Sequence, residues 1–396
     1  MNTPSVVGLP KVITIDDLVD QAERASAFMD ELRGQMLAPS ARKNAPMLSA
    51  AQVGELCGID KGQFNRRLAK GDLPSGKAIN AARREFSVAD ARAWIKALGV
   101  PSVKPPGAKA VTITVGNFKG GVSKTTTVMT LGQGLSLRGY RVLLIDTDPQ
   151  GSLTTLFGIL PDTEVEAEDT IQPLCAGEQS SVRYAIRETY WDGVDLIPAS
   201  PSLFAAEFIL PARQTKDVKF AFWDVLNRGL AEVRDDYDVI VIDTPPSLSY
   251  VTINAFMASE GIIVPMPPNS LDFASSAQFW SLFSDLAASL SRAGKMNKVF
   301  RFIHVLLAKV DMQDSAASVV RRWITATYAE KVLPVEIPRT SVTTFSSAQF
   351  DTVYDIAKYA GSAKTYKRAR EAYDRVVRLV EESIVECWKF PLQGKE

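Results

Sequence analysis

The feature that most constrains the fold is a series of short runs rich in valine and isoleucine that begins at residue 111. The runs cover residues 111–115, 142–145, 194–197, 239–242, 262–264 and 302–307. They are mostly apolar on both faces, which is typical of strands in a parallel sheet covered by helices on both sides. Helical stretches separate them. We therefore predict an α/β fold with a doubly wound, mostly parallel sheet.

Composition narrows the function classes. The 396 residues include 45 Lys and Arg against 45 Asp and Glu, so any basic surface must be local. Three scattered cysteines provide no disulfide framework, zinc knuckle or iron–sulfur site. The single histidine, His304, lies in an apolar run and is expected to be a packed strand residue. The sequence has no signal-peptide pattern and no apolar run of about 18 residues, so we expect a cytoplasmic protein without a membrane span.

The clearest boundary is residues 99–109, where three prolines and two glycines in eleven residues favour a stiff extended connector. Before it, helical periodicity over residues 14–37 predicts a leading helix. The segment 40–107 has 12 Lys and Arg against 5 Asp and Glu, so the basic excess lies there. We expect a leading helix within 1–39, a basic domain 40–98, the linker 99–109, a sheet domain 110–362 and a closing helical segment 363–396.

A phosphate-binding loop is predicted after the first strand. The string GNFKGGVSKTTT, residues 116–127, stands between that strand and a helical stretch. Backbone N–H groups of such a loop point at a bound anion, a lysine at position 124 reaches the β- and γ-phosphates, and the Thr125 hydroxyl holds Mg²⁺. The common pattern G-x-x-x-x-G-K-[ST] fails at both glycines, which are Phe118 and Ser123. A glycine- and lysine-bearing turn without chemistry is the alternative.

The string K-G-G-V-x-K-T-T resembles the deviant Walker A motif of the ParA/MinD group of ATPases, which have the P-loop NTPase fold. The resemblance implies that Lys119 crosses a nucleotide-sandwich dimer to contact the partner's ATP. Two lysines can neutralise a triphosphate shielded from water. If Ser123 needs a positive φ, it costs about 1–2 kcal/mol. The implied nucleotide contacts are Lys119, Gly120, Gly121, Val122, Ser123, Lys124, Thr125 and Thr126.

Two acidic motifs extend the resemblance. The first, DTDPQG at residues 146–151, follows a strand, and the second, VIVIDTPP at 239–246, ends a strand in a carboxylate. By resemblance, Asp148 orients the attacking water, Asp146 supports the magnesium shell, and Asp243 holds Mg²⁺ through water as in a Walker B strand. An Asp–Pro turn is the alternative for the first motif. Residues 267–272 continue the match, Pro338 and Arg339 resemble a segment near the adenine, and the loop 309–311 is a second candidate for base contact.

A helix-turn-helix is predicted within the basic domain. Ser49 and Asp60 are residue types that begin helices, and Gly58 supplies the turn between them. The helix 61–70 is expected to bury Phe64 and Leu68. Its exposed, mostly basic face, predicted to read DNA, consists of Lys61, Asn65, Arg66 and Lys70. A candidate wing over residues 71–88 carries Lys77, Arg83 and Arg84. A helical hairpin with a solvated basic face is the alternative.

This arrangement resembles the large, type Ia partition ATPases, which carry a dimerisation helix and a winged helix-turn-helix that binds the operator of their own operon. The resemblance implies a homodimer, a ParB-type centromere-binding partner that stimulates a weak ATPase, and nonspecific DNA on the nucleoid. The residues 363–388 are predicted to form a helix with an apolar stripe for packing. Its basic positions include three candidates for phosphate contact, Lys367, Arg368 and Arg370. A basic face that is only solvated is the alternative.

The sequence thus predicts a partition ATPase that binds ATP or ADP with Mg²⁺ and represses its own promoter. A MinD-like membrane-cycling ATPase is the runner-up, and it needs a basic amphipathic helix as a terminal anchor. A transcriptional repressor that only senses nucleotide is the non-enzyme alternative. A reductase of the nitrogenase type is excluded because cluster cysteines are missing.

Overall fold

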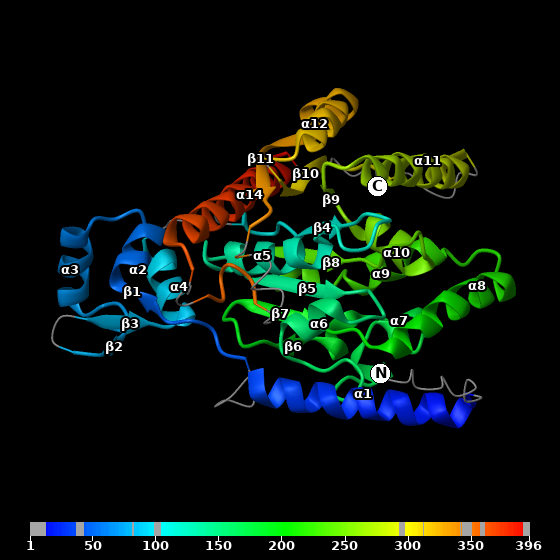
Figure 1. The fold of residues 1–396 in the computed structure, drawn as a ribbon, viewed down its shortest axis with the longest axis horizontal. Helices are drawn as coiled ribbons and strands as arrows, with labels where there is room; N and C mark the ends of the chain where they lie inside the picture. Colours follow the sequence, from blue (N-terminus) through cyan, green and yellow to red (C-terminus); the bar gives the residue numbers. More distant parts are fainter. Residues whose placement is uncertain are drawn as a thin grey trace, which may run out of the picture. The chain divides into compact units, whose positions relative to one another are not determined.

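The computed structural model describes residues 13–36, 43–80, 83–98, 104–292, 298–311, 313–340, 342, 351–356 and 361–390. The chain divides into two units, Met1–Asn44 and Ala45–Glu396. The first contains α1 (Ile15–Met36), which confirms the leading helix (Figure 1). The first part of the linker, residues 99–103, lies outside the described residues.

An eight-stranded sheet forms the centre of the second unit, with the strand order β11-β10-β9-β4-β8-β5-β7-β6. All neighbouring strands are parallel except β6 and β7. The strands are β4 (Val111–Val115), β5 (Val142–Asp146), β6 (Arg187–Glu188), β7 (Val194–Ile197), β8 (Val239–Asp243), β9 (Gly261–Met266), β10 (Phe302–Val310) and β11 (Val332–Pro338). All six predicted strands are confirmed, and the fold class with them.

The two edge strands, β11 and β6, were not predicted from the sequence. β11 contains two prolines and a glutamate, and its residues alternate between buried and more exposed, as an edge strand allows. β6 has only two residues, too few for a recognisable pattern. Both are held by pairing with a neighbour rather than by their own apolar pattern.

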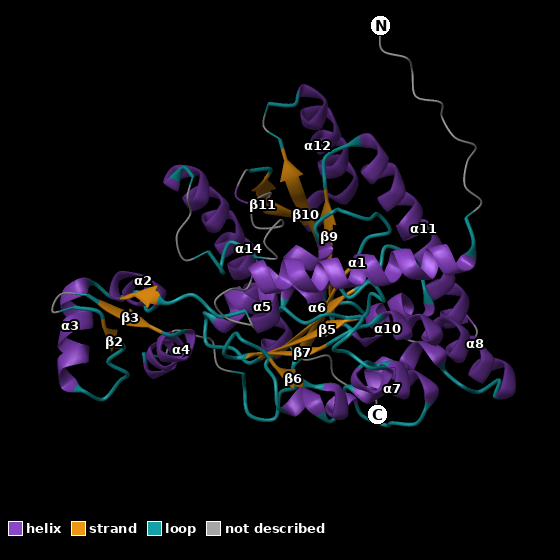
Figure 2. Ribbon diagram, turned by 60° about the horizontal axis from the view of Figure 1, so that its bottom comes forward, coloured by secondary structure: helices purple, strands orange, loops and turns teal. Residues whose placement is uncertain are grey.

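Helices cover both faces of the sheet (Figures 1 and 2). One core cluster joins β-strand residues to α5 (Lys124–Ser136) and α14 (Ala363–Lys389), and a second joins the opposite strand residues to helices that include residues 206–216, 250–258 and 270–292. α5 and α14 approach closely at Gly134, where a Cβ would lie 2.5 Å from a methyl of Val377. The remaining helices are α6 (Ser152–Leu156), α7 (Gln172–Ala176), α8 (Ala206–Lys216), α9 (Val225–Gly229), α10 (Tyr250–Ala258), α11 (Ser270–Arg292) and α12 (Ser315–Tyr328).

A small winged subdomain precedes the sheet. It consists of β1 (Leu48–Ser49), α2 (Ala50–Leu56), α3 (Lys61–Lys70), β2 (Lys77–Ala78), β3 (Arg84–Phe86) and α4 (Val88–Ala97). Ser49 and Asp60 each begin a helix with a capping box, as predicted, and Gly58 turns the chain at φ +66°. Phe64 stacks on Trp94 with ring centroids 4.3 Å apart, whereas Leu68 is only half-buried. The antiparallel strands β3 and β2 occupy the predicted wing.

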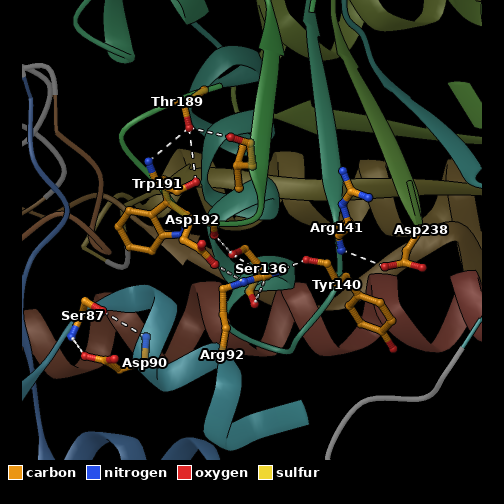
Figure 3. A network of polar contacts seen from close by, with 11 residues as sticks. Ser87, Asp90, Arg92, Ser136, Tyr140, Arg141, Thr189, Trp191, Asp192 and Asp238 are labelled. Carbon is orange, nitrogen blue, oxygen red and sulfur yellow. Dashed lines mark hydrogen bonds and ion pairs between the residues drawn. The ribbon is translucent and has the colours of Figure 1, made fainter. Parts of the chain in front are cut away.

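Arg92 of α4 links this subdomain to the sheet domain by hydrogen bonds and an ion pair (Figure 3). Its side chain is 4% exposed and donates to the backbone oxygens of Ser136, at 2.8 Å, and Tyr140, at 2.7 Å. It also forms an ion pair of 2.6 Å with Asp192. Ser136 ends α5, Tyr140 lies shortly after it, and Asp192 lies in the turn before β7. Arg92 belonged to the basic excess of the sequence, but its charge is used inside the protein and does not contribute to a DNA-facing surface.

Candidate nucleotide-binding site

The phosphate loop joins β4 to α5, in the predicted strand–loop–helix order. At Gly116 a Cβ would lie 2.4 Å from Phe256, so only glycine lets the chain leave the strand there. Gly121 and Ser123 both have left-handed backbones, with φ +72° and +79°. Ser123 therefore bears the strain expected from sequence, about 1–2 kcal/mol. Such strain is typically retained at functional sites, where the surrounding structure enforces it.

The two lysines of the loop lie in different environments. Lys124 is 7% exposed, and its Nζ donates to the backbone oxygen of Lys119 at 3.0 Å. Burial lowers the pKa of Lys124, while the carboxylates of Asp243 and Asp148 oppose that shift. Lys119 is half-buried, and its backbone N–H donates to the side chain of Asn117 at 3.1 Å. The loop thus holds one buried and one partly exposed ammonium group.

Two buried carboxyl groups lie side by side at the C-terminal ends of two central strands of the sheet. Asp146 ends β5 and Asp243 ends β8, and the two residues are paired in register. They are 0% and 1% exposed. Burial raises the pKa of Asp146 to about 7, and burial together with the charge of Asp146 raises the pKa of Asp243 well above its usual range. The nearby hydroxyl of Thr125 opposes this rise in the pKa of Asp243.

This donor set fits Mg²⁺. Two adjacent buried carboxyl groups and a hydroxyl form an oxygen-rich site, and a divalent cation bound there would favour the ionised form of both carboxyl groups. Mg²⁺ is usually held by one or two carboxylates together with substrate phosphates and water. Within the described ranges, no group of three acidic, histidine or cysteine side chains is placed to hold a metal by itself. Carboxylate and hydroxyl oxygens, completed by phosphate oxygens and water, are the ligands that Mg²⁺ usually takes beside a nucleotide.

Hydrogen bonds position the acidic loop after β5. Asp146 accepts from the backbone and hydroxyl of Thr154, at 2.9 and 2.8 Å. Its other oxygen accepts from the backbone of Asp148 at 3.1 Å. Asp148 is half-buried and accepts from the backbone of Gln150 at 3.0 Å. The buried Asp146 thus orients the segment that carries the more accessible Asp148.

The candidate base contacts lie at the ends of the last two strands. Pro338 ends β11, and the exposed Arg339 donates its backbone N–H to the backbone oxygen of Val310 at 2.9 Å. The expectation of a loop over residues 309–311 was wrong for its first two residues, because β10 extends to Val310. The Nζ of Lys309 donates to the backbone oxygen of Gly121 at 2.6 Å. Sequence reasoning missed this contact between the phosphate loop and a residue 188 positions away.

The residues that were predicted to contact DNA differ in how exposed their side chains are. On α3, all four of them are exposed, namely Lys61, Asn65, Arg66 and Lys70. On the wing, Lys77 is exposed and Arg83 pairs with Glu85 at 2.6 Å, but the half-buried Arg84 donates to the backbone of Ser75 at 3.0 Å. On α14, Lys367 and Arg368 are exposed.

Arg370 is the candidate that the geometry disfavours. It is half-buried, its guanidinium lies 4.0 Å from the ring centroid of Tyr354, and it pairs with Asp374 at 3.3 Å. The helix turns this residue toward the packed side, which the sequence pattern did not reveal. Arg370 therefore does not belong to the exposed basic surface of α14 that carries Lys367 and Arg368.

Comparisons with known proteins agree with this geometry. A family model described as an AAA domain matches residues 110–296. The chromosome partitioning protein ParA of Caulobacter vibrioides is 33% identical over 269 residues, which cover 66% of this chain and 94% of that protein. A putative replication protein A of Rhizobium rhizogenes is 28% identical, with 96% of this chain and 98% of that protein covered.

Two solved structures are similar. One, described as a partition protein, has a TM-score of 0.67 and 19% identity, and covers 95% of this chain and 99% of its own. The other is cobyrinic acid a,c-diamide synthase from Mycobacterium smegmatis with bound ADP and magnesium, with a TM-score of 0.53 and 28% identity over 71% of this chain and 96% of that one.

The parallel sheet, the loop after β4 and the carboxylates at the ends of β5 and β8 define a P-loop nucleoside triphosphatase. Within that class, the chain belongs to the ParA family of partition ATPases. In the part of the chain that the structure describes, no helix is both long and apolar enough to cross a membrane.

Proposed function

We propose that this protein is a DNA-partition ATPase that hydrolyses ATP to ADP and phosphate with Mg²⁺, weakly unless it is stimulated. The observation that carries the proposal is the loop with two lysines beside the paired carboxylates of Asp146 and Asp243. A site for phosphate alone has no need of two buried carboxylates, whereas a site for a magnesium nucleotide does.

The residues have separate roles in this proposal. Backbone N–H groups of residues 120–126 and the ammonium of Lys124 hold the phosphates. Thr125 and Asp243 hold Mg²⁺, with Asp146 as support, and the metal supplies charge neutralisation at the phosphates. Asp148 orients the attacking water. Lys119 contacts the nucleotide of a second copy of the chain, so that turnover requires a closed homodimer.

DNA contacts are divided between two surfaces. α3 enters the major groove of an operator, and the wing of β2 and β3 supports it. The exposed ammonium and guanidinium groups at the start of α14 contact phosphates without reading sequence. The helix α1 contributes to dimerisation. Residues 40–98 form the operator-binding domain, residues 99–109 are the linker, and residues 110–362 form the ATPase domain. A ParB-type protein triggers hydrolysis, and the ATP-bound dimer resides on the nucleoid.

A repressor that senses nucleotide without using its turnover is the second candidate. The contact of Arg92 with the end of α5 favours it, because α5 begins at the phosphate loop and ends at the winged subdomain. The membrane-cycling alternative has less support. Its anchor would be α14, but the apolar stripe of that helix is packed in the core at Tyr373, Val377, Val380, Ile384 and Trp388.

The test combines turnover with DNA binding. ATP hydrolysis is measured with and without DNA and a ParB-type centromere-binding protein. Gel-shift assays then compare promoter DNA with random DNA under ATP, ADP and no nucleotide. We expect DNA and partner together to raise turnover, and ATP to promote binding to random DNA. Operator binding without any stimulated turnover would instead support the nucleotide-sensing repressor.

A further inference from the structure

Lys309 is a third lysine at the phosphate loop. It lies near the end of β10, and its Nζ donates to the backbone oxygen of Gly121 at 2.6 Å. β9 separates β10 from β4, the strand that leads into the loop. Pairing between β10 and β9 ends at Leu307, so Lys309 stands beyond the end of β9. Its side chain can therefore reach across that strand end to the loop.

The backbone at Lys309 has an unusual conformation, which directs the side chain toward the phosphate loop. Its φ is +52°, a left-handed conformation that is uncommon for a residue with a side chain. The pairing of β10 with β11 shifts register between Leu307 and Val310, around this residue. Bulges of this kind occur next to active sites, where they re-aim a side chain. Strain retained at one residue whose side chain contacts a binding loop indicates a functional constraint.

The contact acts on the part of the loop that would bind phosphate. Gly120 and Gly121 are exposed, and no atom lies within 4 Å of a Cβ added at either, so packing does not hold this turn. The ammonium of Lys309 binds the carbonyl oxygen of Gly121. Holding a carbonyl on one side of a turn fixes the direction of the neighbouring N–H groups. It also brings a further positive charge next to a site for phosphate.

We propose that Lys309 is a positioning residue of the nucleotide site, which holds the Gly120–Gly121 turn ready for the phosphates. The proposal rests on the proposed function, because it assumes that the loop binds a nucleotide. It assigns Lys309 a role in binding the ground state and none in the chemical step.

The test compares Lys309→Met with Lys331→Met in the full-length protein. Methionine keeps the length and apolar stem of lysine but loses the donor and the charge. Lys331 is an exposed lysine at the end of the segment Ala329–Lys331 and serves as the matched control. Dissociation constants for MgATP and MgADP are measured by calorimetry, and KM and kcat by steady-state hydrolysis.

We expect Lys309→Met to raise both dissociation constants and KM on the order of tenfold, as the loss of a charged hydrogen bond does. The value of kcat should change less than twofold, because ground-state and transition-state binding are weakened alike. Lys309→Arg, which keeps a donor and the charge, should recover most of the affinity. Lys331→Met should match the wild type.

Lys309→Gly separates positioning from folding. Glycine accepts a φ of +52° without strain, so this variant should unfold at or above the wild-type temperature and still bind nucleotide as weakly as Lys309→Met. Unchanged dissociation constants in Lys309→Met, or a loss of kcat alone, would overturn the inference. A wild-type protein that binds neither nucleotide would refute the proposed function itself, and this inference with it.

Discussion

The different environments of the two lysines within the phosphate loop predict different effects of substituting them. Lys124 is buried against the loop backbone, whereas Lys119 is half-buried beside the exposed Gly120. Lys119→Ala should retain measurable ATP affinity but lose ATP-driven dimer closure and turnover, because the proposed target of Lys119 is the nucleotide of the second subunit. Sedimentation with ATP and a hydrolysis assay measure the two effects. Normal turnover in this variant would contradict the role across the dimer.

Asp148 is half-buried, whereas Asp146 is fully buried. We therefore expect Asp148 to act in the chemical step and Asp146 to position the loop. Asp148→Ala should bind ATP nearly as the wild type does but hydrolyse it at least about tenfold more slowly, because a residue that orients water acts on the chemical step. The variant should accumulate as an ATP-bound dimer on random DNA, which a gel-shift assay detects. Loss of ATP binding would make Asp148 a structural or magnesium residue instead.

At the scale of elements, Arg92 joins α4 to the end of α5. Removing one partner from a buried charged network typically costs about 3–5 kcal/mol, and the partial exposure of Asp192 reduces our expectation for Arg92→Ala to about 2–3 kcal/mol. Urea unfolding measures this loss. The matched control is Arg183→Ala, which breaks the exposed pair with Asp236 and should cost about 1 kcal/mol or less. Equal effects of the two substitutions would show that the contact of Arg92 with the end of α5 does not stabilise the protein.

His304 provides a pH test of the packing between β10 and α14. Its Nε2 lies 2.8 Å from the hydroxyl of Ser383, its ring stacks on Phe302 at 4.8 Å, and burial lowers its pKa to about 4. The prediction of a packed strand histidine is confirmed. Because the folded pKa is below the unfolded value of about 6.5, stability is present above about pH 6.5 and is lost as the pH falls toward 4.

Between pH 7 and pH 5, the wild type should therefore lose about 2 kcal/mol more stability than His304→Gln, as measured by urea unfolding. The comparison with the variant cancels the contributions of carboxylates that titrate in the same range. Parallel pH profiles of the two proteins would mean that His304 is already solvated in the folded state.

For the whole molecule, the two DNA activities should be separable. Replacing Arg66 and Lys70 with alanine removes charge from the exposed face of α3 and should abolish operator binding, because base edges are read from the major groove. ATP-dependent binding to random DNA should remain nearly unchanged. Replacing Lys367 and Arg368 should have the opposite effect and lower the salt dependence by about one unit for each lost phosphate contact.

Gel-shift assays at several salt concentrations measure both activities in both double variants. A Lys331→Ala variant controls for the loss of a surface charge elsewhere. If the Arg66 and Lys70 variant loses both activities equally, the two surfaces form one site and the proposed division is wrong.

The sequence by itself determined the parts that local chemistry controls. Capping residues and turns define α3 over Lys61–Lys70, as predicted, because Asp60 and Gly71 satisfy the helix ends within a few residues. Runs of valine and isoleucine identified the six central strands, since burial on both faces leaves a pattern in each strand. The phosphate loop was recognisable because its glycines and lysines stand close together in one short segment between a strand and a helix.

Only the tertiary structure decided what depends on residues far apart in the chain. Burial within the sheet domain raises the pKa of Asp146 and Asp243, and the pairing of β5 with β8 places the two carboxyl groups next to each other. The burial of Arg92 comes from docking α4 on α5. Lys309 reaches Gly121 only because β10 continues beyond the end of β9. Such contacts leave no periodic pattern in either segment, because the free energy of each comes from the geometry that the rest of the fold imposes.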